Sequence, residues 1–304
     1  MNYLITIIGP TGIGKTALSI ALAKHYNCDI ISSDSRQFYR ELRIGTAVPE
    51  DAELNAVKHH FIHHLSIQDK YSVGDFEKDA VEKLNELFKT NNKVVMVGGS
   101  GLYVKAVLEG LDDFPKVPPQ VREDLNNLYK NEGLQPLQEL LKEKDPESFE
   151  KIELQNPHRV IRALEVCLSS NKPYSYYKNK PKTPRNFKSI TIGLTANRPT
   201  IYQRIDERVD EMMTRGLYEE AKAIYPYRAL NALNTVGYKE IFEHLDGKIS
   251  LEYAVSEIKK NTRRFAKRQN TWFKKSKDTE WFDFETPMEE IISYLDTKLN
   301  ETLW

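Results

Sequence analysis

Cysteine is scarce in this sequence, which has only Cys28 and Cys167 among its 304 residues. Two cysteines far apart in the chain exclude an all-cysteine zinc site and a C-x-x-C redox pair. We expect both to be small, buried apolar side chains. The N-terminal apolar run, Leu4–Ile8, is far shorter than the ~20 residues of a membrane span. A cytoplasmic protein that does not bind membranes is therefore expected.

Net charge is also lacking, because 44 lysine and arginine residues balance 44 aspartate and glutamate residues. The charge is nevertheless unevenly distributed along the chain. Nine basic residues and no acidic one lie between Lys259 and Lys277. A basic segment inside a neutral protein indicates an anionic partner at that segment rather than general attraction to polyanions.

The clearest local pattern is a phosphate-binding loop that follows the run Leu4–Ile8. The segment GPTGIGKT fits G-x-x-x-x-G-K-[ST]. In such loops, backbone N–H groups converge on an anion at a helix N-terminus, the lysine adds charge, and the last hydroxyl binds a metal ion. The predicted site consists of Gly9, Pro10, Thr11, Gly12, Ile13, Gly14, Lys15 and Thr16, with Thr16 as the metal ligand.

The usual companion groups of an ATPase are missing. Such enzymes need an apolar strand that ends in an acid, which holds magnesium, and a residue that orients the nucleophile. The apolar segment VVMVGGSGLY ends in glycines instead. The only acid well placed at a strand end is Asp34 in CDIISSDSRQFYR. We therefore expect phosphate and metal ligands with one carboxylate, and no ATP hydrolysis.

Short apolar runs alternate with helical patterns in the N-terminal part, which predicts a parallel sheet with crossover helices. We expect strands at 4–8, 29–31 and 94–97, and helices from Lys15 and at 75–89, the latter capped by Ser72 and Asp75. Beyond the proline-rich segment DDFPKVPPQ, residues 120–170 are predicted to be helical only. The last of these helices should start at Asn156. The strand pattern SITIGLTA then returns, so the helical segment is an insertion.

The predicted fold is therefore an α/β, P-loop NTPase-like parallel-sheet core with an inserted helical domain. The core should comprise residues 1–112 and 188–304, the second part including basic C-terminal helices. The insertion should comprise residues 113–187.

One predicted helix, RPTIYQRIDERVDEMMTRG, has an arginine inside its apolar stripe. Ile201, Ile205 and Met212 share one face, and Arg208 falls between them. The arginine either pairs with a core carboxylate or lies in a cleft and clamps an anionic ligand. We favour the clamp, because a guanidinium fits a diphosphate well.

A long basic amphipathic helix is predicted in LEYAVSEIKKNTRRFAKRQNTWFKK. Its apolar face should carry Leu251, Val255, Ile258, Phe265, Trp272 and Phe273, and the eight basic residues from Lys259 to Lys275 should occupy the other half. The basic half, including Lys267 and Arg268, indicates phosphate-backbone binding, although a solvated or membrane-surface helix has a similar pattern. Gln269 lies on the apolar face, where an amide suggests a contact in a cleft.

Four of the seven histidines lie in HHFIHHL, at His59, His60, His63 and His64. If this segment were helical, the i,i+4 pairs could bind zinc. No cysteine or acid accompanies them in a zinc-binding pattern, so we expect structural roles and no metal.

Six segments occur in the order found in tRNA dimethylallyltransferases, a family that this chain resembles from residue 9 to about 275. They are GPTGIGKT, SSDSRQFYRELRIGTAVP, GGSGLYVKAVLEGL, HRVIRALEV, LNTVGYKE and KRQNTWFKK. The resemblance implies that the loop holds the diphosphate of dimethylallyl diphosphate. The dimethylallyl group would then pass to N6 of the adenosine next to the anticodon, position 37, and diphosphate would leave.

The resemblance also implies roles for individual residues. Asp34 would be the general base, Thr16 and Arg208 would handle the diphosphate, and Lys15 would neutralise its charge. Implied tRNA contacts are Asp34, Ser35, Arg36, Gln37, Ser100, Arg122, His158, Arg159, Val160, Ile161 and Arg162, with Lys267, Arg268 and Gln269 added from the basic helix. The chain departs from common family residues at Gly12-Ile13, Ser33 and Ser100, but no functional group is lost.

The implied cofactor is Mg²⁺, and the implied partners are the tRNA anticodon stem-loop and dimethylallyl diphosphate. We expect a monomer. Three other activities stay open. A related prenyltransferase acts on free adenine nucleotides, a P-loop nucleotide kinase would leave the basic helix unexplained, and an RNA-binding module would leave Asp34 unexplained.

Overall fold

The computed structural model describes residues 1–178 and 180–301. Residue 179 of the expected insertion and residues 302–304 of the expected core lie outside this range. The chain forms two compact units, one from Met1–Glu109 with Arg185 onward and one from Gly110–Pro184. The second unit thus begins and ends a few residues before the expected bounds of 113–187.

The first unit is built on a six-stranded sheet in which every paired strand is parallel, with the order β3-β2-β4-β1-β5-β6. Its strands are β1 (Tyr3–Ile8), β2 (Ile30–Ser32), β3 (His59–His60), β4 (Lys93–Val97), β5 (Lys188–Thr195) and β6 (Thr279–Asp283). The α/β fold class with a parallel sheet is confirmed. Because all strands point the same way, the loops that follow their carboxyl ends meet at one edge of the sheet.

Strand β1 lies inside the sheet and is buried along its whole length. Side chains alternate between faces in a strand, so Leu4 and Ile8 join one apolar cluster while Ile5 and Ile7 join the other. Burial on both faces explains why this segment is a continuous apolar run rather than an alternating one.

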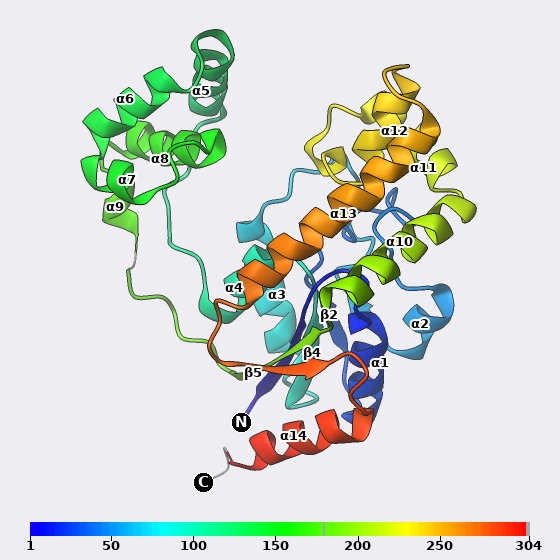
Figure 1. Ribbon diagram of the computed structural model, residues 1–304. Helices are drawn as coiled ribbons and strands as arrows, with labels where there is room; N and C mark the ends of the chain where they lie inside the picture. The colour runs from blue at the N-terminus through cyan, green and yellow to red at the C-terminus, as the bar shows by residue number, and fades with distance from the viewer. Residues whose placement is uncertain (179, 302–304) are drawn as a thin grey trace. The chain divides into compact units, whose positions relative to one another are not determined.

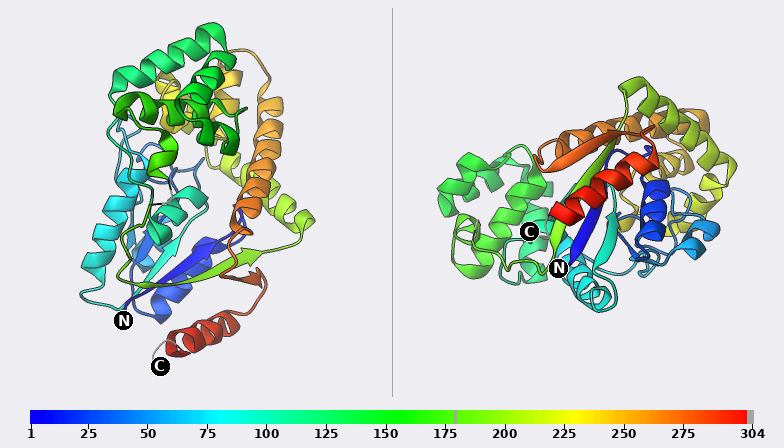
Figure 2. Two further views of the ribbon diagram at one scale, coloured as in Figure 1. Left: turned by 90° about the vertical axis from the view of Figure 1, so that its left-hand side faces the viewer. Right: turned by 90° about the horizontal axis from the view of Figure 1, so that it is seen from below.

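Helices cover both faces of the sheet, as Figure 2 shows for α3 and α14. One face packs against α1 (Lys15–His25), α10 (Arg198–Thr214) and α14 (Met288–Glu301). The other packs against α3 (Val73–Leu87), α4 (Gly101–Glu109), α11 (Leu217–Ile224) and α12 (Tyr238–Leu245). The short α2 (Asp51–Ala56) and the 3-10 turns at 225–227 and 231–233 complete the loops.

The predicted basic helix is α13 (Leu251–Phe273), which runs beside α10 (Figure 1). It contributes Ile258 and Phe273 to one apolar cluster and Ala266 to the other. This helix therefore connects the two cores. None of the described helices is long and apolar enough to cross a bilayer.

Two helix starts were predicted correctly from side-chain chemistry. Ser72 and Asp75 form the reciprocal capping box of α3, and Asn156 accepts a hydrogen bond from the Arg159 N–H at the start of α8 (Pro157–Ser170). The strands β3 and β6 and the helix α14 were not predicted. The first is only two residues long, and TEWFD in β6 is mostly half-exposed, so neither has a strong apolar pattern.

The second unit is helical, with α5 (Pro119–Glu132), α6 (Gln135–Lys144), α7 (Pro146–Lys151), α8 and α9 (Tyr174–Tyr177). Its core includes Leu125, Leu137, Leu141 and Leu164, together with Val160 and Ile161. The side chains of Val160 and Ile161 are buried, so they are not available for the tRNA contacts that we expected of them. His158 and Arg159 in the same segment are exposed.

Arg122 also has an internal partner in this unit. Its guanidinium donates to both carboxylate oxygens of Glu165, which is fully buried, and Arg162 donates to the same carboxylate at 3.2 Å. This pairing raises the pKa of Arg122. The two arginines thus supply the hydrogen bonds that a buried carboxylate requires.

We predict that Arg122→Gln lowers the stability of the second unit by about 1–3 kcal/mol, because a buried carboxylate loses its two-pronged partner. Thermal unfolding followed by circular dichroism measures the change. Arg159→Gln is the matched control, since the ion-pair partner of Arg159 among the described residues is the exposed Glu153. Equal melting temperatures for the two variants would contradict a structural role for Arg122.

Candidate active site

The phosphate-binding loop lies between β1 and α1, at the carboxyl edge of the sheet. Gly9 and Gly14 adopt φ values of 144° and 107°, which favour glycine. A Cβ atom on Gly9 would also lie 2.6 Å from the carbonyl oxygen of Leu194 in β5. The loop therefore depends on glycine for its tight turn, and it brings its N–H groups to the start of α1, which has no acid in its first turn.

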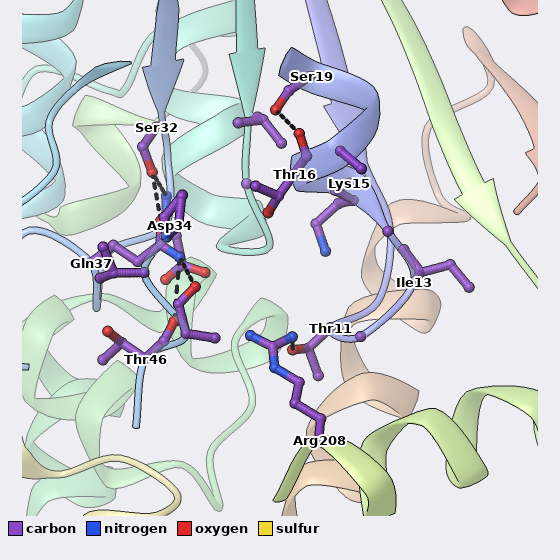
Figure 3. Close-up of a pocket in the computed structure, with 18 of the residues that line it drawn as sticks. Thr11, Ile13, Lys15, Thr16, Ser19, Ser32, Asp34, Gln37, Thr46 and Arg208 are labelled. Atoms are coloured by element: carbon purple, nitrogen blue, oxygen red, sulfur yellow. Dashed lines mark hydrogen bonds between the residues drawn. The ribbon is translucent and has the colours of Figure 1, made fainter. Parts of the chain in front are cut away.

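A cavity of about 580 Å³ lies against this loop. Figure 3 shows Lys15, Thr16 and Arg208 around it, with Asp34, Gln37 and Thr46 on the opposite side. Arg208 comes from α10 and donates to the Thr11 hydroxyl at 3.2 Å. Lys15 donates to the Pro10 carbonyl at 2.8 Å. At the loop, Lys15, Arg208, the loop N–H groups and the Asp34 carboxylate thus border one space. The wider wall of the cavity also carries two further arginines, Arg204 and Arg215, and the carboxylates of Glu50, Glu53, Glu207 and Glu211.

Electrostatic effects distinguish these cations from ordinary surface residues. Burial lowers the pKa of Lys15 to about 8; the nearby Asp34 carboxylate opposes this shift, and Arg208 adds to it. Burial also lowers the pKa of Arg208, and Asp34 again opposes the change. The two poorly hydrated cations next to the loop favour an anionic ligand there, which would restore the interactions that burial removes.

Arg208 lies beside a buried stripe formed by Ile201, Ile205 and Val209, whereas Met212 is only partly buried. Its hydrogen bond to Thr11 and its place on the cavity wall favour a ligand-facing position over a pair with a core carboxylate. Arg204, one turn earlier, donates to the Gly12 carbonyl at 2.8 Å and so ties α10 to the loop.

Asp34 follows β2, and its Oδ1 accepts a hydrogen bond from the Arg36 N–H at 3.1 Å. The side chains of Arg36 and Gln37 are used inside the fold. Arg36 donates to the carbonyls of residues 231, 232 and 234. Gln37 donates to the carbonyls of Thr46 and Ala47. Both residues thus hold the loop that positions Asp34, rather than projecting freely towards a partner.

A second cavity, of about 620 Å³, adjoins the first. The two share the lining residues Thr11, Asp34, Thr46, Arg208, Phe265 and Gln269. Its remaining wall is largely apolar and includes Val209, Met212, Leu102 and Trp272, with the hydroxyls of Ser35 and Ser100 in mutual contact at 3.1 Å. Asp34 and Arg208 therefore lie where a polar cavity meets a more apolar one.

A family model described as IPP transferase matches residues 37–276. The chain belongs to the IPP transferase family. It is 58% identical over 299 residues to the tRNA dimethylallyltransferase of Christiangramia forsetii, covering 98% of this chain and 99% of the relative. The corresponding enzyme of Flavobacterium johnsoniae is 55% identical, with all of both chains covered. The resemblance drawn from the six sequence segments is confirmed.

Two solved structures agree with this assignment of the IPP transferase family. The tRNA isopentenylpyrophosphate transferase of Bacillus halodurans is 36% identical, with a TM-score of 0.73 over 99% of this chain and 98% of that chain. A eukaryotic dimethylallyltransferase described as acting on tRNA is 26% identical, with a TM-score of 0.81 over 94% of this chain and 75% of its own.

Gln269 of this IPP transferase chain bridges two loops of the site. Its Oε1 accepts a hydrogen bond from the Thr11 N–H at 2.9 Å, and its Nε2 donates to the Gly99 carbonyl at 2.9 Å. A Cβ atom on Gly99 would lie 2.3 Å from that Nε2, so glycine permits the close approach. The amide on the apolar face of α13 thus has an internal partner at each end, which makes it a positioning residue instead of an evident tRNA contact.

The apolar face of α13 is only partly packed against the core, and its basic half is only partly free of partners. Phe265 and Trp272 are 39% and 40% exposed and line the second cavity, because the helix borders a cavity there and not a packed core. Lys259 pairs with Asp210 at 2.6 Å and Arg263 with Asp206 at 2.7 Å, both on α10. Exposed basic residues with no ion pair to the described residues are Arg264, Lys267, Arg268, Lys274 and Lys275.

The histidine cluster is not helical. His59 and His60 form β3, and positive φ angles at Phe61 and His63 turn the chain afterwards. His60 contacts Asp29 at 2.8 Å, and His59 contacts the Val57 carbonyl at 2.8 Å. Among residues 1–178 and 180–301, no group of three or more His, Cys, Asp or Glu side chains could hold a metal ion. Both cysteines are buried and free, as expected.

We predict that Lys15 makes diphosphate binding depend on pH. With a pKa of about 8 in the free protein, Lys15 is charged below pH 8 and neutral above it. The affinity advantage of the wild type over Lys15→Met for inorganic diphosphate should therefore shrink as the pH rises from 7 to 9. Calorimetric titration at both pH values measures it, and the variant corrects for titration of diphosphate itself. A constant advantage would show that Lys15 does not titrate in this range.

Proposed function

We propose that this protein transfers the dimethylallyl group of dimethylallyl diphosphate to N6 of adenosine 37, next to the anticodon of tRNA, and releases diphosphate. Relatives that match the whole chain are named tRNA dimethylallyltransferases. The observation that carries the proposal within this molecule is the position of Asp34. Its carboxylate borders both the cation-lined cavity and the more apolar cavity next to it.

The donor binds in the first cavity. The loop N–H groups, Lys15 and Arg208 hold the diphosphate, whose negative charge grows as the carbon–oxygen bond breaks. The Thr16 hydroxyl lines the same cavity, and a single hard oxygen ligand beside a diphosphate suits Mg²⁺, which commonly takes most of its ligands from phosphate and water. When bound, Mg²⁺ makes the diphosphate a better leaving group.

Asp34 performs the proton transfer. The exocyclic amine of adenine is a poor nucleophile, because its lone pair is delocalised into the ring. As N6 bonds to the allylic carbon, the bond from that carbon to the diphosphate oxygen breaks and the N6 proton passes to the Asp34 carboxylate. The neighbouring cations Lys15 and Arg208 are electrostatically coupled to this carboxylate.

The second cavity receives the adenine. A base can reach Asp34 only if it leaves its stack in the anticodon loop. The apolar wall with Trp272 and Phe265 suits a flat aromatic ring, and Ser35 and Ser100 offer hydroxyl groups. Arg268 lines this cavity and is exposed, which suits a contact with the RNA. In the second unit, the exposed His158 and Arg159 are candidates for further contacts with the RNA.

Nucleoside analysis tests the proposal directly. The protein is incubated with Mg²⁺, dimethylallyl diphosphate and either tRNA or AMP, and the products are digested and analysed by mass spectrometry. We expect dimethylallyl adenosine from tRNA and none from AMP. Product from AMP alone would assign the protein to the enzymes that act on free adenine nucleotides. ATP turnover without RNA would indicate a kinase instead.

For Asp34, we predict that Asp34→Asn slows prenyl transfer by roughly 10²- to 10⁴-fold, because a general base is lost while the shape of the side chain is kept. The dissociation constant for tRNA should stay within about a few-fold of the wild-type value, since proton transfer and not binding depends on the charge. Single-turnover kinetics with a filter-binding assay separate the two effects. Turnover at the wild-type rate would refute the assignment.

For Arg208, we predict that alanine raises the Michaelis constant for the prenyl donor and slows the chemical step, because a contact with the leaving group strengthens in the transition state. Arg208→Lys should rescue little, since a point charge does not replace a planar fork. Donor kinetics, tRNA affinity and melting temperature are measured on both variants. A large stability loss with an unchanged donor Michaelis constant would instead indicate a core arginine.

A further inference from the structure

A third cavity, of about 310 Å³, lies between the end of β5, the start of α10 and the last turns of α13. It shares no lining residue with either cavity of the active site. The helices α10 and α13 run side by side here (Figure 1). Lys267 lines this cavity, whereas its neighbour Arg268 lines the second cavity, which we propose receives the acceptor adenine (the acceptor cavity). The two residues therefore point to different sides of α13. The third cavity is thus a separate site on the other flank of the same helix.

The charge on this cavity is positive and uncompensated. Arg198, Lys267 and Lys274 line it, no acidic residue does, and none of the three forms an ion pair with the described part of the chain. Arg198 is the first residue of α10, whose first turn contains no acid. A cation is unfavourable at the positive end of a helix dipole unless an anion lies nearby. The arrangement is therefore more favourable with an anion bound.

The uncharged lining adds hydrogen-bonding capacity. The Oδ1 atom of Asn270 is buried and has no hydrogen-bond partner in the described part of the chain. Buried amides normally have partners. Rotating the side-chain amide of Asn270 by 180° exchanges its oxygen and NH₂ positions. The NH₂ group can then donate to an oxyanion in the cavity. The hydroxyls of Thr195 and Thr271 also line the cavity. Three cations with hydroxyl and amide groups form a set suited to a single phosphate group.

We propose that this cavity binds one phosphate of the RNA backbone, outside the nucleotide that reacts. This inference rests on the proposed function, because tRNA is the polyanion that the active site requires. The exposed Lys275 directly follows Lys274 and extends the positive surface beyond the cavity, as a continuous polyanion needs and a small free anion does not. An RNA strand whose base enters the acceptor cavity beside Arg268 passes close to Lys267. The third cavity then holds the strand on the opposite flank of α13.

The test uses the double variant Arg198→Gln/Lys274→Gln, whose two sites are exposed. The matched control is Lys24→Gln/Lys78→Gln, which removes the same charge from exposed sites on α1 and α3. The dissociation constant of an anticodon stem-loop RNA is measured from about 50 to 200 mM KCl. We expect the slope of log Kd against log salt to fall by about 0.7 to 0.9 in the cavity variant and to stay unchanged in the control. The rate at saturating RNA and the donor Michaelis constant should stay unchanged in both.

Replacing each RNA phosphate in turn by an uncharged methylphosphonate identifies the bound group. One replacement should weaken binding to the wild type but have no further effect on the cavity variant. Titration with inorganic phosphate distinguishes a free anion site. If the wild type and the cavity variant differ in affinity for phosphate but have the same RNA affinity and salt slope, the assignment to RNA is wrong. A salt slope equal to that of the control also overturns it. Failure of the proposed function is distinct, because the wild type would then bind RNA and form no prenylated nucleoside.

Discussion

The attraction between Asp34 and two poorly hydrated cations is the interaction on which the rest of the active site depends. Lys15 belongs to the phosphate-binding loop and Arg208 to α10, so three separate segments meet around one cavity. Burial lowers the pKa of both cations, and Asp34 opposes this change. The same carboxylate borders both cavities, and we propose it as the proton acceptor there. In the proposed reaction, a single acid thus contributes both to donor binding and to chemistry.

Maintaining this arrangement requires hydrogen bonds between distant segments. Gln269 joins the phosphate-binding loop to the loop after β4, and Gln37 joins the Asp34 loop to residues 46 and 47. Arg36 binds three carbonyl groups near the start of α12. These side chains belong to segments that also line the cavities. In this protein, polar residues next to the reacting groups serve to position the loops, and the groups that face the substrates are few.

The positive charges are likewise divided between those with partners inside the fold and those without. The net charge of the chain is zero. Two cations of α13, Lys259 and Arg263, pair with acids on α10. In the second unit, Arg122 and Arg162 pair with the buried Glu165. On α13, the described cations without such partners are the ones that we propose attract RNA. Lys267 and Lys274 line the third cavity and Arg268 lines the second, so in our proposal this helix presents two binding surfaces rather than one basic half.

Local patterns in the sequence determined the phosphate-binding loop, several helix starts and the position of Asp34. The glycines, lysine and threonine of residues 9–16 predict the phosphate-binding loop because their roles depend on backbone conformation and on neighbours within one turn. Capping by Ser72 and Asn156 is equally local. The position of Asp34 beside the loop followed from its place after a strand, because parallel strands bring their carboxyl ends together.

Only the tertiary structure decided which polar residues face a cavity and which are used internally. Gln269 bonds to residues 258 and 170 positions away, and Arg122 reaches Glu165 across 43 positions. Periodicity placed Phe265 and Trp272 on the apolar face of the helix, but at these positions that face borders a cavity instead of a packed core. Sequence spacing defines the face of a helix on which a side chain lies. The partner on that face is set by contacts between segments far apart in the chain, and no local pattern encodes them.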